Sequence, residues 1–164
     1  MPFGGNDWLA LSPEPALEPA MPICDPHHHF WDFRTTRLPY QRYLLHELAA
    51  DMQSGHNVRS TVFIEARAMY RADGTEEMRP VGEVEFVQGL AAASASGLYG
   101  PGRDAAAIVG HANLNLGAGV APVLEALRAA SPWTNSTSPT GRSSSGPPAR
   151  YIDRASMNTV ERTL

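Results

Sequence analysis

The spacing of apolar residues alternates between two patterns along the middle of the chain. Three short segments are predicted strands: residues 23–29, which enter a polar cluster; residues 58–66, a β-branched run of the kind buried in parallel sheets; and residues 105–114, which have a polar end. Apolar residues at three- and four-residue spacing follow each segment, as expected for helices that bury one face. These helical sets are Leu44, Leu48 and Met52; Val84, Val87, Leu90 and Ala91; and Val120, Val123, Leu124 and Leu127. The order β-α-β-α-β-α predicts an α/β fold with a parallel sheet.

The two ends of the chain lack this periodicity. Residues 1–21 hold prolines among glycines and acids, and residues 133–164 are rich in Ser, Thr, Pro and Gly. Such segments have too little apolar surface to offset the entropy cost of ordering. We therefore expect a flexible Pro-rich arm at 1–21, one globular region at 22–132, and a disordered tail at 133–164.

Charge and cysteine content narrow the class of protein. A formal net charge of −4 argues against a nucleic-acid-binding protein, which would normally carry a basic surface. No apolar run is long enough to span a bilayer, so we expect no membrane partner. Cys24 is the single cysteine, which fits a reducing, cytoplasmic compartment, and we expect it to be a small core residue.

A cluster of histidines ends the first predicted strand. His27 and His29 are two residues apart, so on a strand their side chains share one face, while His28 points to the other. Neutral imidazole is a good zinc ligand, and this pair would form half of a chelating site. Asp25 or Asp32 could orient a ligand imidazole. The alternative is a solvent-exposed loop or an adventitious metal-binding tract.

Three further polar residues lie where the second and third strands end. Glu65 and Arg67 are two apart near the end of the second strand, and His111 lies at the end of the third. Carboxyl ends of parallel strands are where this architecture places functional groups, so we expect all three to contact a substrate. The alternatives are a local Glu65–Arg67 ion pair and an ordinary, hydrogen-bonded histidine.

The segment at residues 25–32, Asp-Pro-His-His-His-Phe-Trp-Asp, resembles the opening of the amidohydrolase-related proteins, in the branch with sugar-lactone and pyrone-dicarboxylate lactone hydrolases. Similar blocks follow at residues 60–67, 69–74, 79–87 and 108–114. The resemblance runs from about Pro22 to Ser131.

This resemblance implies the first part of a (β/α)8 barrel, whose complete form needs roughly 250 residues. It implies that His27 and His29 hold a divalent metal, most commonly zinc, although some relatives work without one. The family adds a later histidine and a terminal aspartate that acts as general base. Neither has a counterpart here, so no catalytic base is assigned.

Two functional hypotheses follow from these observations. The first is a hydrolase that opens a lactone or similar carboxylic ester with activated water, here truncated and therefore weakly active or inactive. The second is a non-catalytic fragment that binds metal or associates through an exposed sheet edge, because the third strand of three would be unpaired.

Overall fold

The computed structural model describes residues 11–12, 14–33, 41–131 and 150–151. Its main sheet is parallel and contains, in spatial order, β1 (Pro22–His28), β4 (Asn57–Ile64), β5 (Arg103–Val109) and β6 (Arg150–Tyr151). The helices are α2 (Leu45–Met52) between β1 and β4, α3 (Val81–Ala95) between β4 and β5, and α4 (Ala121–Ala130) after β5. The predicted alternation of strands and helices and the parallel sheet are confirmed.

Several short elements have no counterpart in the predicted pattern. They are β2 (Trp31–Asp32), β3 (Arg42–Tyr43), and the 3₁₀ helices Glu76–Met78 and Leu114–Val120. β2 and β3 pair with each other in an antiparallel ribbon. Apolar periodicity cannot predict β2, β3 or the Glu76–Met78 helix, because two or three residues do not complete a repeat.

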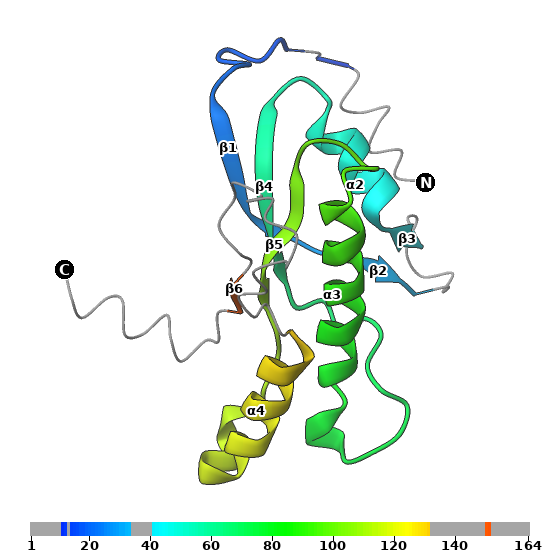
Figure 1. Ribbon diagram of the computed structural model, residues 1–164, viewed down its shortest axis with the longest axis vertical. Helices are drawn as coiled ribbons and strands as arrows, with labels where there is room; N and C mark the ends of the chain where they lie inside the picture. The colour runs from blue at the N-terminus through cyan, green and yellow to red at the C-terminus, as the bar shows by residue number, and fades with distance from the viewer. Residues whose placement is uncertain (1–10, 13, 34–40, 132–149, 152–164) are drawn as a thin grey trace, which may run out of the picture.

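The main core lies between the sheet and its helices. Figure 1 shows α2 and α3 on the same side of the strands. Phe63 and Ile108 from the sheet, and Val84 and Val87 from α3, are at most 1% exposed. Burying each such side chain stabilises the fold by about 1.5–3 kcal/mol relative to leaving it in water.

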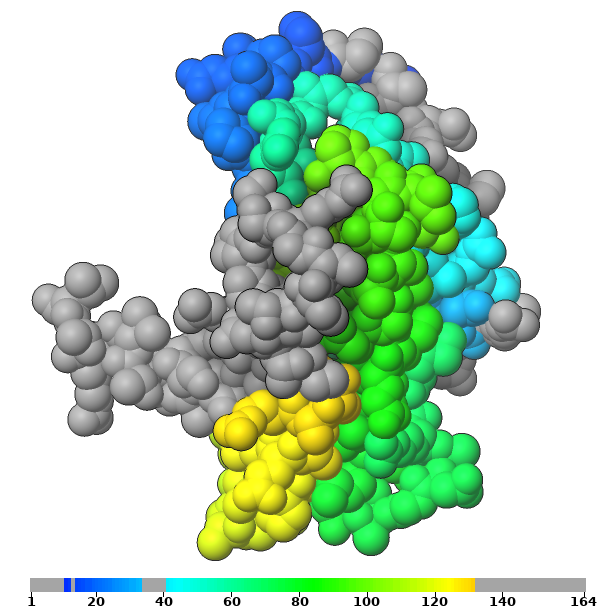
Figure 2. All heavy atoms as spheres, viewed as in Figure 1, coloured from blue at the N-terminus to red at the C-terminus, as the bar shows by residue number. Residues whose placement is uncertain are grey.

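Helix α4 extends this core at the carboxyl end of β5. Its Val123 and Leu127 are buried, as the helical spacing predicted. In the space-filling view, α4 (yellow) and α3 (green) form one continuous surface (Figure 2). The Ser131 hydroxyl donates a hydrogen bond to Oε1 of Gln88, 3.1 Å away, which ties the end of α4 to α3.

Two sequence-based expectations need correction here. The third strand does not present an open edge along its whole length, since Ala107 and Ile108 of β5 pair with β6. Those β6 residues come from the segment predicted to be disordered; most of that tail, and of the N-terminal arm, lies outside the described residues. Cys24 is exposed instead of buried, in the strand β1 at the edge of the sheet. Within the described part of the chain, no helix is long and apolar enough to cross a membrane.

Candidate functional site

The candidate site lies at the carboxyl edge of the parallel sheet. His27 and His29 lie at the end of β1, Glu65 and Arg67 follow β4, and His111 follows β5. Because the strands are parallel and adjacent, these ends meet along one edge. The predicted strands were too long: β4 ends before Glu65 and β5 before His111, so these side chains are carried by the loops that leave the sheet.

The two outer histidines of the cluster face each other. Nε2 of His27 lies 3.2 Å from Nε2 of His29. Nδ1 of His29 lies 2.7 Å from the carbonyl oxygen of Ile64. A carbonyl oxygen can only accept, so Nδ1 carries the proton and the lone pair of neutral His29 is on Nε2, the nitrogen that faces His27. Of the two acids expected to orient a ligand imidazole, Asp25 contacts the backbone: its Oδ1 accepts a hydrogen bond from the N–H of His27, at 3.0 Å.

This geometry fits two positions of a zinc site. At the usual Zn–N bond length, two ligand nitrogens in a tetrahedral arrangement lie about 3.3 Å apart. The separation between the two Nε2 atoms is 3.2 Å. No cluster of three or more His, Cys, Asp or Glu suited to a metal occurs among the described residues. The spacing of His27 and His29 is therefore compatible with two zinc ligands, and the described residues do not complete a ligand set.

His28 occupies the opposite face of β1, as the alternation of side chains on a strand predicts. It is 7% exposed and packs against Phe30 and Phe63 in edge-on ring contacts. Burial lowers the pKa of His28 to about 4, and neither ring nitrogen has a hydrogen-bond partner among the described residues. His28 is therefore a neutral core residue rather than a third ligand.

A pocket of about 530 Å³ opens beside the histidine pair. Its lining residues are His29, Trp31, Phe33, Glu65, Ala66 and Arg67. The pocket combines an imidazole, a carboxyl group and a guanidinium group with two aromatic rings. It brings together His29, Glu65 and Arg67, which the sequence singled out separately.

Glu65 pairs with His111 instead of with Arg67. Nδ1 of His111 lies 2.8 Å from Oε2 of Glu65, and both side chains are about one-third exposed. The contact is a close approach of two ionisable groups and not an aligned hydrogen bond, since Oε2 has no donor in a suitable direction among the described residues. The carboxylate favours a proton on Nδ1, which leaves Nε2 of neutral His111 able to accept one.

Two polar residues beneath the pocket were missed by the sequence reasoning. Glu83 is fully buried, and its Oε1 accepts hydrogen bonds from the backbone N–H groups of Ala66 and Ala68, at 3.0 and 2.7 Å. Burial raises the pKa of its carboxyl group. Burial likewise raises the pKa of Tyr70 to about 12. The sequence did contain a signal for Glu83. It lies four residues before the apolar Val87, so a helix places both residues on the same, buried face.

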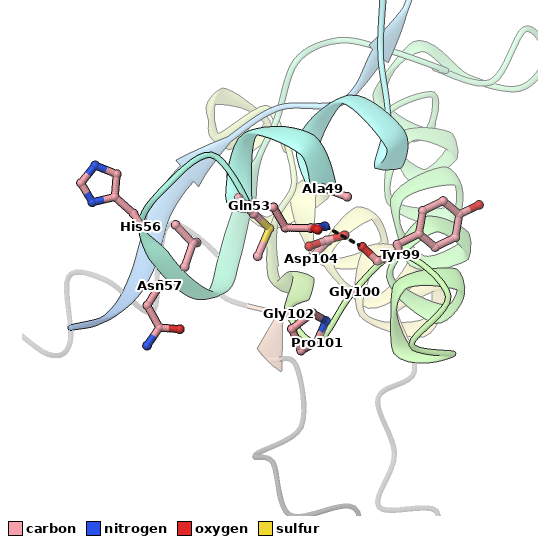
Figure 3. Close-up of a pocket in the computed structure, with 11 residues that line it drawn as sticks. Ala49, Gln53, His56, Asn57, Tyr99, Gly100, Pro101, Gly102 and Asp104 are labelled. Carbon is pink, nitrogen blue, oxygen red and sulfur yellow. Dashed lines mark hydrogen bonds between the residues drawn. The ribbon is translucent and has the colours of Figure 1, made fainter. Parts of the chain in front are cut away.

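The opposite, amino-terminal edge of the sheet has a pocket of its own, of about 210 Å³ (Figure 3). It lies between the end of α2 and the first residues of β4 and β5. Asp104 is its one buried acid, and burial raises the pKa of that carboxyl group. Nε2 of Gln53 donates to the Tyr99 carbonyl oxygen at 3.4 Å, the dashed line in Figure 3.

No family model, no curated protein and no solved structure matches this chain.

Proposed function

We propose that the carboxyl edge of the sheet is the active site of a hydrolase of amidohydrolase-related type, which opens a lactone or a similar carboxylic ester. The observation that carries the proposal is the gathering of five polar residues at one edge of the sheet. His29, Glu65 and Arg67 line one pocket, while His27 contacts His29 and His111 contacts Glu65. The order of strands and helices is that of the first three units of a (β/α)8 barrel, and a partial barrel of this kind is part of the proposal.

In the proposed reaction, His27 and His29 would hold a zinc ion. When bound, zinc would supply Lewis-acid chemistry, polarising the ester carbonyl and easing loss of a proton from water. The chelating geometry of the two Nε2 atoms supports this role, and the carbonyl of Ile64 keeps His29 in the tautomer that it requires.

The Glu65–His111 pair would handle the proton. Nε2 of His111 would take a proton from the attacking water while Glu65 stabilises the imidazolium that forms. The water oxygen adds to the carbonyl carbon, the ring C–O bond breaks, and the leaving alkoxide takes up the proton. The product is a hydroxy acid. In this proposal His111 has the role of the aspartate general base that lies on the last strand of the family's barrel.

The remaining pocket residues would bind the substrate. Arg67 offers a cation for a carboxylate or for the negative charge that develops on the carbonyl oxygen. The rings of Trp31 and Phe33 offer an apolar surface for the carbon skeleton. The site therefore favours a small anionic lactone.

The test is lactone hydrolysis by the full chain, with and without added zinc, on a panel of five- and six-membered lactones that includes carboxylated ones. We expect slow turnover, because the described residues supply only two zinc ligands. Changing both His27 and His29 to Ala should abolish it. His56→Ala is the matched control, since His56 is an exposed histidine at the opposite edge, and it should retain full activity.

Three outcomes separate the hypotheses. Turnover that survives the double change removes these histidines from the site. No turnover on any lactone, with zinc binding that depends on His27 and His29, supports the alternative of a non-catalytic metal-binding chain. Loss of zinc binding in the His56→Ala variant would move the metal site to the other edge.

A further inference from the structure

The turn that follows β4 has an unusual backbone. Arg67 and Met69 have φ angles of 57° and 54°. A residue with a Cβ atom meets steric conflict in this left-handed region. Two such residues in one turn therefore persist only where the surrounding structure imposes the conformation. Ala66 and Arg67 of this turn form part of the pocket wall.

Glu83, near the start of α3, supplies one constraint on the turn. Its Oε1 accepts hydrogen bonds from the backbone N–H groups of Ala66 and Ala68, the two residues that flank Arg67. The carboxyl group is completely buried, and its other oxygen has no hydrogen-bond partner within the described residues. Burying a carboxyl group is unfavourable unless it makes strong hydrogen bonds, and here those bonds go to this turn.

The neighbouring residue of α3 supplies a second constraint. A Cβ atom on Gly82 would lie 2.6 Å from the carbonyl oxygen of Met69 and 2.8 Å from the backbone nitrogen of Arg71. The helix backbone therefore packs directly on the backbone of the turn. A hydrogen bond of 3.0 Å from Arg71 N–H to the Arg79 carbonyl closes the same loop.

We propose that Glu83 is the positioning residue of the pocket: its carboxylate holds the Ala66–Ala68 turn in the conformation that places Arg67 in the pocket wall. Glu83 touches no substrate in this arrangement and acts through the backbone of the turn. The proposal rests on the proposed function only in assuming that Arg67 meets an anionic ligand. The geometry of the turn can be tested without any reaction.

The first experiment compares Glu83→Gln with Glu85→Gln in the full chain. Glu85 is on the same helix, is exposed, and pairs with Arg71, so its change removes a carboxylate without touching the Ala66–Ala68 turn. Hydrogen exchange of the Ala66 and Ala68 amides is followed by NMR. Glu83→Gln should speed exchange at both amides by about tenfold or more, while Glu85→Gln changes it less than about twofold.

The second measurement uses benzoate, which joins a carboxylate to an aromatic ring, as a probe of the pocket. Glu83→Gln should weaken benzoate binding by about fivefold or more while circular dichroism stays unchanged. Unchanged exchange at Ala66 and Ala68 would overturn the proposal. So would a uniform rise in exchange over the whole chain, which indicates general destabilisation. A wild-type chain that does not bind benzoate counts against the proposed function, and the exchange result still decides the role of Glu83.

A double-mutant cycle covers the case in which Glu83→Gln folds poorly. Glycine adopts the left-handed region without steric conflict, so Arg67→Gly should remove the need for a constraint at that position. The fall in Tm caused by Glu83→Gln should then shrink by about half or more in the Arg67→Gly background. Additive falls in Tm would show that Glu83 does not act on this turn.

Discussion

The two edges of the parallel sheet each carry a pocket, yet their polar groups are used differently. At the amino-terminal edge, the pocket residues Gln53 and Asp104 make hydrogen bonds that involve the backbone: Nε2 of Gln53 donates to the Tyr99 carbonyl oxygen, and the backbone N–H of Asp104 donates to the Ser94 hydroxyl at 3.0 Å. At the carboxyl edge, ionisable side chains lie directly against one another: His27 against His29 at the end of β1, and Glu65, after β4, against His111, after β5. The comparison teaches that contact between ionisable side chains, more than the presence of a hollow, distinguishes a candidate site.

The largest difference between the edges should be in catalysis. Glu65→Gln or His111→Gln should lower the rate of lactone hydrolysis by about 100-fold or more, because each removes half of the proton-handling pair. Asp104→Asn at the other edge should leave the rate within about twofold. Initial rates at saturating lactone give the comparison. Equal losses at both edges would mean that the variants act through stability, which thermal melting would reveal.

Replacing a glycine with alanine should cost more stability at the carboxyl edge than at the amino-terminal edge. Gly82→Ala should lower the free energy of unfolding by about 2 kcal/mol, because the new methyl group would meet backbone atoms that cannot move independently. Gly102→Ala, at the amino-terminal edge, also meets a close neighbour, the terminal methyl of Met52, but that flexible side chain can rotate away. Its cost should stay below about 1 kcal/mol. Urea unfolding measures both, and a larger cost at Gly102 would reverse the argument.

Replacing the buried histidine should have a smaller and opposite effect. His28→Phe keeps a ring against Phe30 and Phe63 and removes two buried nitrogens that have no partner among the described residues. We expect a gain of about 1 kcal/mol at pH 7. The exposed His27→Phe is the control and should not stabilise. Loss of stability in His28→Phe would show that its nitrogens do form hydrogen bonds in solution.

The smallest expected effect concerns the pH dependence contributed by Asp104. Burial raises the pKa of this carboxyl group in the folded state. The folded chain therefore holds the Asp104 proton to a higher pH than the unfolded chain. The contribution of Asp104 to the free energy of unfolding is present at low pH and decreases as pH rises through the folded-state pKa. Asp104→Asn should flatten this decrease in a series of thermal melts. Asp73→Asn, at an exposed position, should not.

The sequence predicted the main elements well because the repeats were long. Val84 and Val87 on α3, and Val123 and Leu127 on α4, are buried as their spacing indicated. Parallel pairing followed from the alternation of strands and helices. The short β2–β3 ribbon and the β6 pairing carry no periodic signal, and they depend on tertiary contacts that a local pattern does not encode.

The sequence identified the residues of the candidate site but not the contacts that they make. Strand alternation correctly separated His28 from the outer pair. The partner of His29 proved to be the carbonyl of Ile64, and Glu65 turned to His111 instead of Arg67, because the strand had ended and the turn had changed direction. Backbone partners and left-handed turns have no side-chain signature, which explains why these contacts and the role of Glu83 required the structure.

The bond between His29 and Ile64 joins residues 35 positions apart on neighbouring strands. It forms only when β1 and β4 are paired, so the histidine pair is preorganised by the native state alone. A zinc ion bound there would therefore bind the folded chain in preference to the unfolded one, and by mass action would raise its melting temperature with zinc concentration. In this sense the site is thermodynamically linked to the sheet: a change that weakens strand pairing would also lower metal affinity, even far from either imidazole.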